Sequence, residues 1–92
     1  MEFEWNPSKD AANLVKHGIS FAGAARAFDG QMLVRPSDRS AESRWIGVGR
    51  IGTHVVAIVF TRRGAVVRLI SARKARKYEK AAHLSAFPEG PS

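Results

Sequence analysis

Three strand-like segments follow one another in the second half of the chain, and they restrict its fold more than any other feature. They cover residues 43–51, 54–61 and 65–72. The connections, at Gly52 and at Arg62-Arg63-Gly64, are short turns of the kind that join antiparallel neighbours. The middle segment is apolar from residue 55 to residue 60, which is typical of a central strand covered on both faces. We therefore expect an antiparallel sheet of about four to five strands.

Capping signals before this sheet predict an edge strand and two N-terminal helices. Residues 2–5 alternate between acidic and aromatic side chains, as in a short edge strand. Asn6 and Pro7 form a helix start, and Gly18 is a natural stop. Ser20 is the expected cap of a second helix that ends at residues 29–30. The side chains expected to face the core are Ala11, Leu14 and Val15 in the first helix and Phe21, Ala24, Ala25 and Phe28 in the second.

The remaining segments complete an α+β fold in a single domain. Residues 31–35 suit a further strand, and residues 36–42 suit a polar loop. A C-terminal helix is expected over residues 73–86. The side chains that it would turn inward are Ala75, Tyr78 and Ala82. Residues 87–92 are expected to form a flexible tail. We predict helices packed on an antiparallel sheet, in one domain over residues 1–86.

Positive charge is concentrated in the second half of the chain. The formal net charge is +7 over 92 residues, yet residues 44–80 contain ten Lys and Arg and a single acid, Glu79. Most of these cations are arginines, whose flat fork of donors suits phosphate. This distribution indicates a surface for a polyanion, nucleic acid above all, or for an acidic protein. The alternative is a basic face that only keeps the protein in solution.

Composition excludes several classes of site. The chain has no cysteine, which removes disulfides, thiolate zinc sites and iron–sulfur clusters. The acids are scattered and the three histidines belong to three predicted elements, so we expect neither a metal centre nor a cofactor. The first residues lack the basic and apolar regions of a secretory signal, and no apolar run is long enough to span a bilayer. We therefore expect a cytoplasmic protein.

Cleavage of RNA needs neither metal nor cofactor, because the 2′-hydroxyl of the RNA can act as the nucleophile. The protein then has to move protons and stabilise negative charge on phosphorus. His17, in the last turn of the first helix, is a candidate for proton transfer or merely a cap of that helix. Lys16 beside it is a candidate catalytic residue or only a solvated lysine. Arg68 lies mid-strand between Val66 and Ile70, where a charge needs a partner or a ligand.

Other cations are candidates for binding RNA. Glu42 and Arg44 are two residues apart in an extended segment, so they point the same way, as base and phosphate ligand or as a surface ion pair. Arg73 has the opposite parity to Arg68, so a regular strand places the two on different faces. Ser71 shares the parity of Arg73 and is a possible cap of the last helix. The remaining expected RNA contacts are Arg62, Arg63 and Lys74.

Four stretches of sequence, in order along the chain, form a recognisable pattern. They are residues 5–9 with Asn13 and residues 16–21, residues 24–29, residues 42–49, and residues 68–79. The pattern resembles the BrnT family of type II toxins, which are small ribonucleases with a RelE-like fold. This sequence has Asn6, Ala22-Gly23 and His83 where the family usually has an aspartate, an acidic residue and a tyrosine.

The resemblance implies an endoribonuclease toxin that a cognate BrnA-like antitoxin neutralises in a hetero-oligomer. In the family the antitoxin carries the DNA-binding domain, so this chain would contact DNA only indirectly. We predict metal-independent attack by the 2′-hydroxyl, with His17 or Glu42 moving protons and Arg68 and Arg44 on the phosphate. The alternatives are a nucleic-acid-binding module without catalysis and a protein-interaction domain whose basic face binds an acidic partner.

Overall fold

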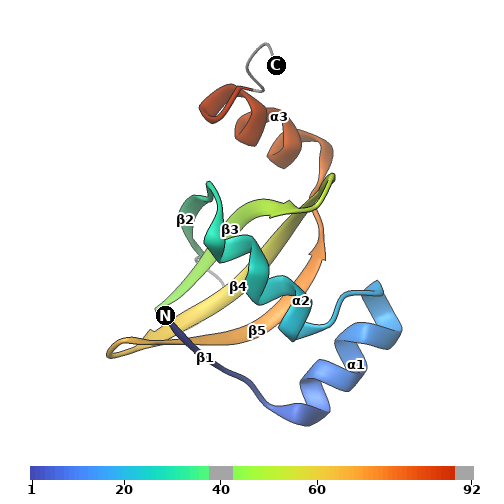
Figure 1. Ribbon diagram of the computed structural model, residues 1–92, viewed down its shortest axis with the longest axis vertical. Helices are drawn as coiled ribbons and strands as arrows, with labels where there is room; N and C mark the ends of the chain where they lie inside the picture. Colours follow the sequence, from blue (N-terminus) through green and yellow to red (C-terminus); the bar gives the residue numbers. More distant parts are fainter. Residues whose placement is uncertain (38–42, 89–92) are drawn as a thin grey trace.

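The computed structural model describes residues 1–37 and 43–88 (Figure 1). Glu42 of the predicted site and residues 89–92 of the predicted tail lie outside this part of the chain. The described elements are β1 (Glu2–Glu4), α1 (Pro7–His17), α2 (Phe21–Ala25), the 3₁₀ helix η1 (Arg26–Asp29), β2 (Leu33–Ser37), β3 (Arg44–Ile51), β4 (His54–Arg63), β5 (Val66–Lys74) and α3 (Lys77–Ala86). The predicted α+β class is confirmed.

The strands form one mixed sheet in the order β1-β5-β4-β3-β2. The neighbours from β2 to β5 pair antiparallel, as the short turns predicted. β1 instead lies parallel to β5, with Glu4 opposite Arg68. The expectation of a wholly antiparallel sheet is therefore wrong at this edge. No hairpin joins β1 to β5, and the long connection between them lets the chain return in either direction.

The two faces of the sheet differ in what covers them. α2 and η1 cross one face (Figure 1), and the main core lies there, made of Phe21, Ala24, Ala27, Val56, Ile58, Phe60, Val67, Leu69 and Ala72. A smaller cluster of Val48, Ala57 and Ala75 lies apart from that core. Strand alternation and pairing place six arginines on the face opposite the main core. This surface, called the arginine face below, carries Arg35, Arg44, Arg50, Arg63, Arg68 and Arg73.

A β-bulge decides which side chains of β5 reach the arginine face. The pairing of β5 with β4 shifts by one residue at Ile70. The extra residue reverses the alternation, so Arg68 and Arg73 lie on the same face. The regular alternation assumed from the sequence is therefore wrong here. Ser71 lies within β5 next to the bulge and does not cap α3.

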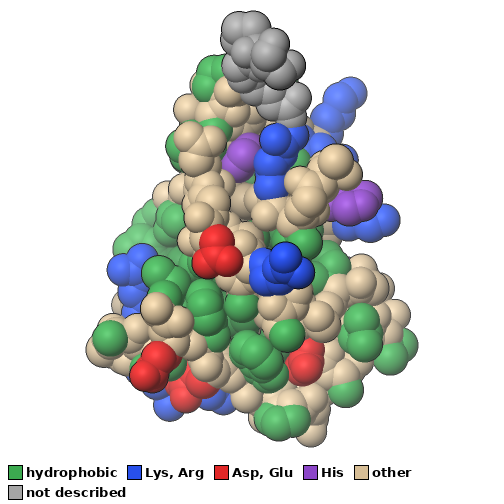
Figure 2. All heavy atoms as spheres, in the orientation of Figure 1, with side chains coloured by type: hydrophobic (Ala, Val, Ile, Leu, Met, Phe, Trp, Pro, Cys, Tyr) green, Lys and Arg blue, Asp and Glu red, His purple; other side chains and the backbone are tan. Residues whose placement is uncertain are grey.

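Helix α1 is capped as predicted, but the side of it that was expected to face the core faces solvent. Asn6 Oδ1 accepts a hydrogen bond from the first turn at 2.8 Å, and Gly18 ends the helix with a φ of 72°. The expected apolar stripe faces outward, since Leu14 is 51% and Val15 is 89% exposed. Figure 2 shows hydrophobic side chains on the surface in the lower right, where α1 lies. The buried residue of α1 is Asn13.

Asn13 completes an edge of β5 that β1 does not cover. The pairing of β1 with β5 ends at Arg68. Further along β5, Asn13 Nδ2 donates to the Ala72 carbonyl at 2.9 Å, and Asn13 Oδ1 accepts from the Ala72 amide at 3.1 Å. Nδ2 also donates to the Ile19 carbonyl at 2.9 Å. These bonds satisfy strand-edge groups that burial would otherwise leave unpaired, and they decide which side of α1 faces inward.

Sheet pairing continues past several of the predicted boundaries. β5 runs to Lys74, so α3 begins at Lys77 and not at residue 73. β4 likewise includes Arg62-Arg63, and the turn follows at Gly64, whose φ is 60°. The second helix divides into α2 and η1, and β2 starts later than expected. For β4 and β5 the reason is that ladder hydrogen bonds to a neighbouring strand outweigh local preferences.

Helix α3 buries polar side chains where apolar ones were expected. Ala75 is buried but precedes the helix, while Tyr78 and Ala82 are exposed, so the predicted inward face is wrong. The helix buries Glu79 and His83. The His83 ring nitrogen Nε2 lies 3.2 Å from a backbone carbonyl just before β2. The His83 contact links α3 to the segment between η1 and β2.

Candidate active site

The arginine face is hollowed where β2, β3, β5 and the start of α3 meet. The cavity, called the arginine cavity below, has a volume of about 420 Å³. Its polar lining consists of Arg35, Arg44, Arg73, Arg76, Tyr78, Ser37 and Ser71, and its apolar lining includes Ile46, Val59 and Ile70. Guanidinium groups dominate its chemistry, and they bind phosphate through several charge-assisted hydrogen bonds.

Four different elements deliver the arginines of this cavity. Arg35 and Arg44 come from the neighbouring strands β2 and β3. Arg73 comes from the end of β5, where the bulge turns it toward the arginine face. Arg76 is the N-cap residue of α3. The site therefore exists only when the sheet and α3 are assembled.

Glu79 connects three of these arginine residues. Arg73 donates two hydrogen bonds to its carboxylate, from Nη1 at 2.7 Å and from Nη2 at 3.1 Å. Arg35 Nη2 donates to the same carboxylate at 3.2 Å, and the backbone amide of Arg76 donates at 2.8 Å. The Glu79 side chain is only 1% exposed. Its buried charge is thus fully hydrogen-bonded, as a buried carboxylate requires.

These bonds decide the protonation of Glu79. Burial by itself raises the pKa of a carboxylate, because it disfavours the charged form. Here the hydrogen bonds from Arg73, from the Arg76 amide and from Arg35 outweigh burial and lower the pKa of Glu79 from 4.5 to about 2. The hydrogen bond to Glu79 in turn raises the pKa of Arg73. At neutral pH Glu79 is a fixed anion and a poor proton acceptor.

Tyr78 supplies a hydroxyl at the same cavity. Its oxygen lies 3.5 Å from Arg35 Nη2, and the residue is 57% exposed. Among the described residues that line the cavity, it is the one titratable side chain that is not an arginine. A phenol hydroxyl both donates and accepts hydrogen bonds, so Tyr78 can give a proton to a reacting oxygen or take one from it.

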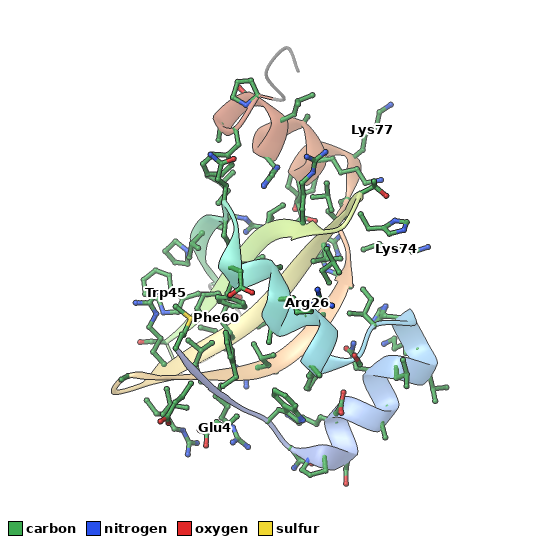
Figure 3. All side chains as sticks on the ribbon, in the orientation of Figure 1. Glu4, Arg26, Trp45, Phe60, Lys74 and Lys77 are labelled. Carbon is green, nitrogen blue, oxygen red and sulfur yellow. The ribbon has the colours of Figure 1, made fainter. Side chains whose placement is uncertain are left out.

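Two of the predicted arginines lie on the arginine face but away from the cavity. Arg68 Nη1 lies 3.5 Å from Glu4 Oε1, and Arg63 Nε lies 3.8 Å from the same oxygen. The partner that a mid-strand arginine requires is therefore Glu4, across the parallel pair of β1 and β5. Figure 3 places Glu4 at the end of the molecule away from α3.

The structure brings together only part of the predicted site. Arg44 and Arg73, two of the predicted RNA-binding residues, both line the cavity. Lys16 and His17 belong to the last turn of α1, which contributes none of the cavity's described lining. Figure 1 shows α1 and α3 at opposite ends of the molecule. The structure therefore does not bring His17 and Arg44 into one site.

Two further predicted RNA contacts point elsewhere. Arg62 alternates with Arg63 along β4, so it projects toward the opposite face. Lys74 is exposed at the end of β5, and Figure 3 shows its side chain at the right-hand edge of the molecule. Neither residue lines the arginine cavity.

Sequence reasoning missed three residues of the cavity region, namely Arg35, Tyr78 and Glu79. One signal was present: Glu79 is the single acid among ten cations in residues 44–80. An isolated acid within a basic segment indicates a specific arginine partner. Tyr78 was assigned to the core because the start of α3 was placed too early.

Two kinds of feature are absent from residues 1–37 and 43–88, which the structure describes. No group of three or more His, Asp or Glu side chains there is arranged to hold a metal ion. No described helix combines the length and the apolar composition that crossing a membrane requires.

Comparison with known proteins identifies a family and a similar solved structure. A family model described as the ribonuclease toxin BrnT of type II toxin–antitoxin systems matches residues 5–79. The crystal structure of the Brucella abortus ribonuclease toxin BrnT is similar, with a TM-score of 0.70 and 29% sequence identity. The match covers 84% of this chain and 99% of that chain. No curated protein matches the sequence.

Proposed function

Because this chain belongs to the BrnT family of ribonuclease toxins of type II toxin–antitoxin systems, we propose that it cleaves RNA at the arginine cavity. The observation that carries this proposal is the convergence of Arg35, Arg44, Arg73 and Arg76 on one cavity of about 420 Å³. Such a cavity is complementary to a phosphodiester whose negative charge increases during reaction.

The proposed reaction uses the 2′-hydroxyl of the RNA as the nucleophile. Its oxygen forms a bond to the adjacent phosphorus as its proton leaves, and the bond from phosphorus to the 5′-oxygen breaks. The products are a 2′,3′-cyclic phosphate and a free 5′-hydroxyl. The phosphorus passes through a state with additional negative charge on its oxygens, and hydrogen bonds from Arg44 and Arg73 stabilise that charge.

Tyr78 is our candidate for one of the two proton transfers. Its hydroxyl lies beside Arg35 at the cavity, where it can protonate the departing 5′-oxygen. Glu42 precedes Arg44 by two residues in the sequence and lies outside the described residues. Its assignment as the base that accepts the 2′-proton stays a prediction. His17 lies on α1 and is not part of the proposed site.

We further propose that the reaction is independent of metal ions. The guanidinium groups around the cavity supply the positive charge that a divalent cation provides in other nucleases. Their combined positive charge also disfavours the binding of a divalent metal ion in the cavity. The support for this proposal is the chemistry of the lining.

The arginine face offers a path for the rest of the RNA. Arg68 and Arg63 lie on the same face as the cavity, so an RNA strand bound in the cavity can extend along the face to these two arginines. We propose that a cognate antitoxin, of the BrnA-like kind that the family resemblance implies, neutralises the toxin in a hetero-oligomer. An acidic segment of that antitoxin would compete with RNA for the arginine face.

Cleavage of a short, 5′-labelled single-stranded RNA in excess EDTA tests the proposal. We expect cyclic phosphate products, and no cleavage of the same strand with a 2′-deoxy nucleotide at the scissile position. Arg73→Ala is expected to reduce the rate about 100-fold, whereas Arg26→Ala, which removes an exposed charge on the helix-covered side, leaves it unchanged. RNA binding without cleavage would favour a non-catalytic module. Absence of RNA binding would favour a protein-interaction domain.

A further inference from the structure

Two arginines of the cavity owe their relative position to one carboxylate. Arg35 and Arg73 belong to β2 and β5, and the strands β3 and β4 lie between them in the sheet. No backbone pairing therefore fixes one guanidinium against the other. Both donate hydrogen bonds to Glu79, at 3.2 Å from Arg35 and at 2.7 and 3.1 Å from Arg73.

We propose that Glu79 is a positioning residue, which holds Arg35 and Arg73 in the orientation that a scissile phosphate requires. This inference rests on the proposed cleavage of RNA at the arginine cavity. Glu79 itself is 2% exposed and does not line the cavity, so it does not touch the substrate. It acts through the two arginines.

The Glu79 carboxylate is itself held in place by contacts other than those with the two arginines. The backbone amide of Arg76 donates to Glu79 Oε1 at 2.8 Å, in the first turn of α3. This bond and burial hold the carboxylate in place relative to the helix. An arginine side chain has several rotatable bonds and loses rotamer entropy when it is ordered. Ordering by Glu79 takes place during folding, so bound RNA does not have to supply it.

The hydrogen bonds also leave donors free for a ligand. Within the described residues, Arg35 donates hydrogen bonds only through Nη2, to Glu79 and to Tyr78. A guanidinium has five N–H groups, so most of the Arg35 fork remains available to phosphate oxygens. The Tyr78 hydroxyl accepts a hydrogen bond from the same Arg35 nitrogen, so the network around Glu79 also positions this hydroxyl.

An electrostatic consequence separates positioning from simple charge balance. Glu79 is a negative charge beside a site for a polyanion, so its removal raises the net positive charge and favours RNA binding. If Glu79 only balanced charge, Glu79→Gln would bind RNA at least as well and cleave it as fast. If Glu79 positions the arginines, the same variant cleaves slowly although it binds RNA.

The test measures single-turnover cleavage by Glu79→Gln, together with its dissociation constant for a non-cleavable 2′-O-methyl RNA. We expect the cleavage rate to fall about 10- to 100-fold, with a dissociation constant within about threefold of the wild type. In an Arg73→Ala background, Glu79→Gln should reduce the rate by a smaller factor than in the wild type, because only its support of Arg35 is left to lose. An unchanged rate in the single variant, or full additivity in the double variant, overturns the proposal.

Asp10→Asn provides the matched control for charge and stability. Asp10 accepts a hydrogen bond from the Phe21 amide at 2.8 Å, on the helix side of the molecule. The variant also loses one negative charge while it keeps an oxygen that can accept the Phe21 hydrogen bond, and it should cleave RNA at the wild-type rate. Thermal unfolding of both variants identifies the temperature at which each remains folded, and cleavage is compared there.

A second measurement tests the positioning role of Glu79 even if the wild-type chain cleaves no RNA. The nitrogen-15 NMR signals of arginine guanidinium groups report how freely each group rotates. We expect restricted rotation of Arg73 in the wild type and in Asp10→Asn, and free rotation in Glu79→Gln. Absence of wild-type cleavage would refute the proposed function. Equal restriction of Arg73 in all three proteins would refute the positioning role.

Discussion

Arg68 and Arg73 lie on the same face of the sheet, although their spacing places them on opposite faces of a regular strand. The bulge at Ile70 lies between them and reverses the alternation. A single unpaired residue thus gathers the positive charge of β5 on one side. The arginine face, and the cavity at one end of it, depend on this irregularity.

RNA binding should therefore distinguish two arginines on neighbouring strands. Arg68 projects from the arginine face, whereas Arg62 of β4 projects from the opposite face. Arg68→Ala should weaken binding of a single-stranded RNA and reduce the slope of log affinity against log salt by about 0.7. Arg62→Ala should leave the slope unchanged. Equal effects of the two variants in a salt titration would contradict the assignment of the binding face.

Tyr78→Phe should slow cleavage without weakening RNA binding. Loss of a general acid typically lowers the rate about 10²- to 10⁴-fold, and the phenylalanine ring preserves the shape of the side chain. The defect should disappear with a substrate whose 5′-bridging oxygen is replaced by sulfur, because a thiolate leaves without being protonated. Single-turnover kinetics on both substrates provide the measurement. An equal loss on both would assign Tyr78 to another role.

The stability of the fold should decrease in acid because of Glu79. Its pKa is lowered in the folded state from 4.5 to about 2, so the folded state binds fewer protons than the unfolded state in this range. The contribution is present in full above about pH 5 and is lost as the pH falls toward 2, and its size is on the order of 3 kcal/mol. Urea unfolding at pH 7 and pH 3 measures the part of this contribution that is lost by pH 3, about 2 kcal/mol. In Glu79→Gln the pH dependence should be correspondingly smaller, and an unchanged dependence would contradict the assignment.

Asn13 should matter more for stability than the apolar residues next to it. Asn13→Ala removes a side chain that makes three hydrogen bonds, two of them to the Ala72 backbone, and should cost about 2–4 kcal/mol. Leu14→Ala removes a half-exposed side chain and should cost less than about 1 kcal/mol. Equilibrium unfolding in urea compares the two. A larger cost for Leu14→Ala would mean that α1 packs through its apolar stripe after all.

Local features of the chain were determined by the sequence alone. The caps at Asn6 and Ser20 and the stop at Gly18 were predicted correctly, because each involves hydrogen bonds within a few residues. The hairpins of β3, β4 and β5 also follow from their short turns. The concentration of arginine indicated a polyanion surface, and the ordered motifs pointed to the family that the comparisons identify.

Only the tertiary structure decided which side chains meet. Asn13 is buried because it pairs with Ala72, 59 positions away, and no local pattern reveals a strand edge that lacks a neighbour. The bulge at Ile70 places Arg73 beside the arginines of β2 and β3, and Glu79 then joins Arg73 to Arg35. Periodicity describes one element at a time, whereas register and hydrogen-bond partners are settled by the competition among all elements for burial and for polar contacts.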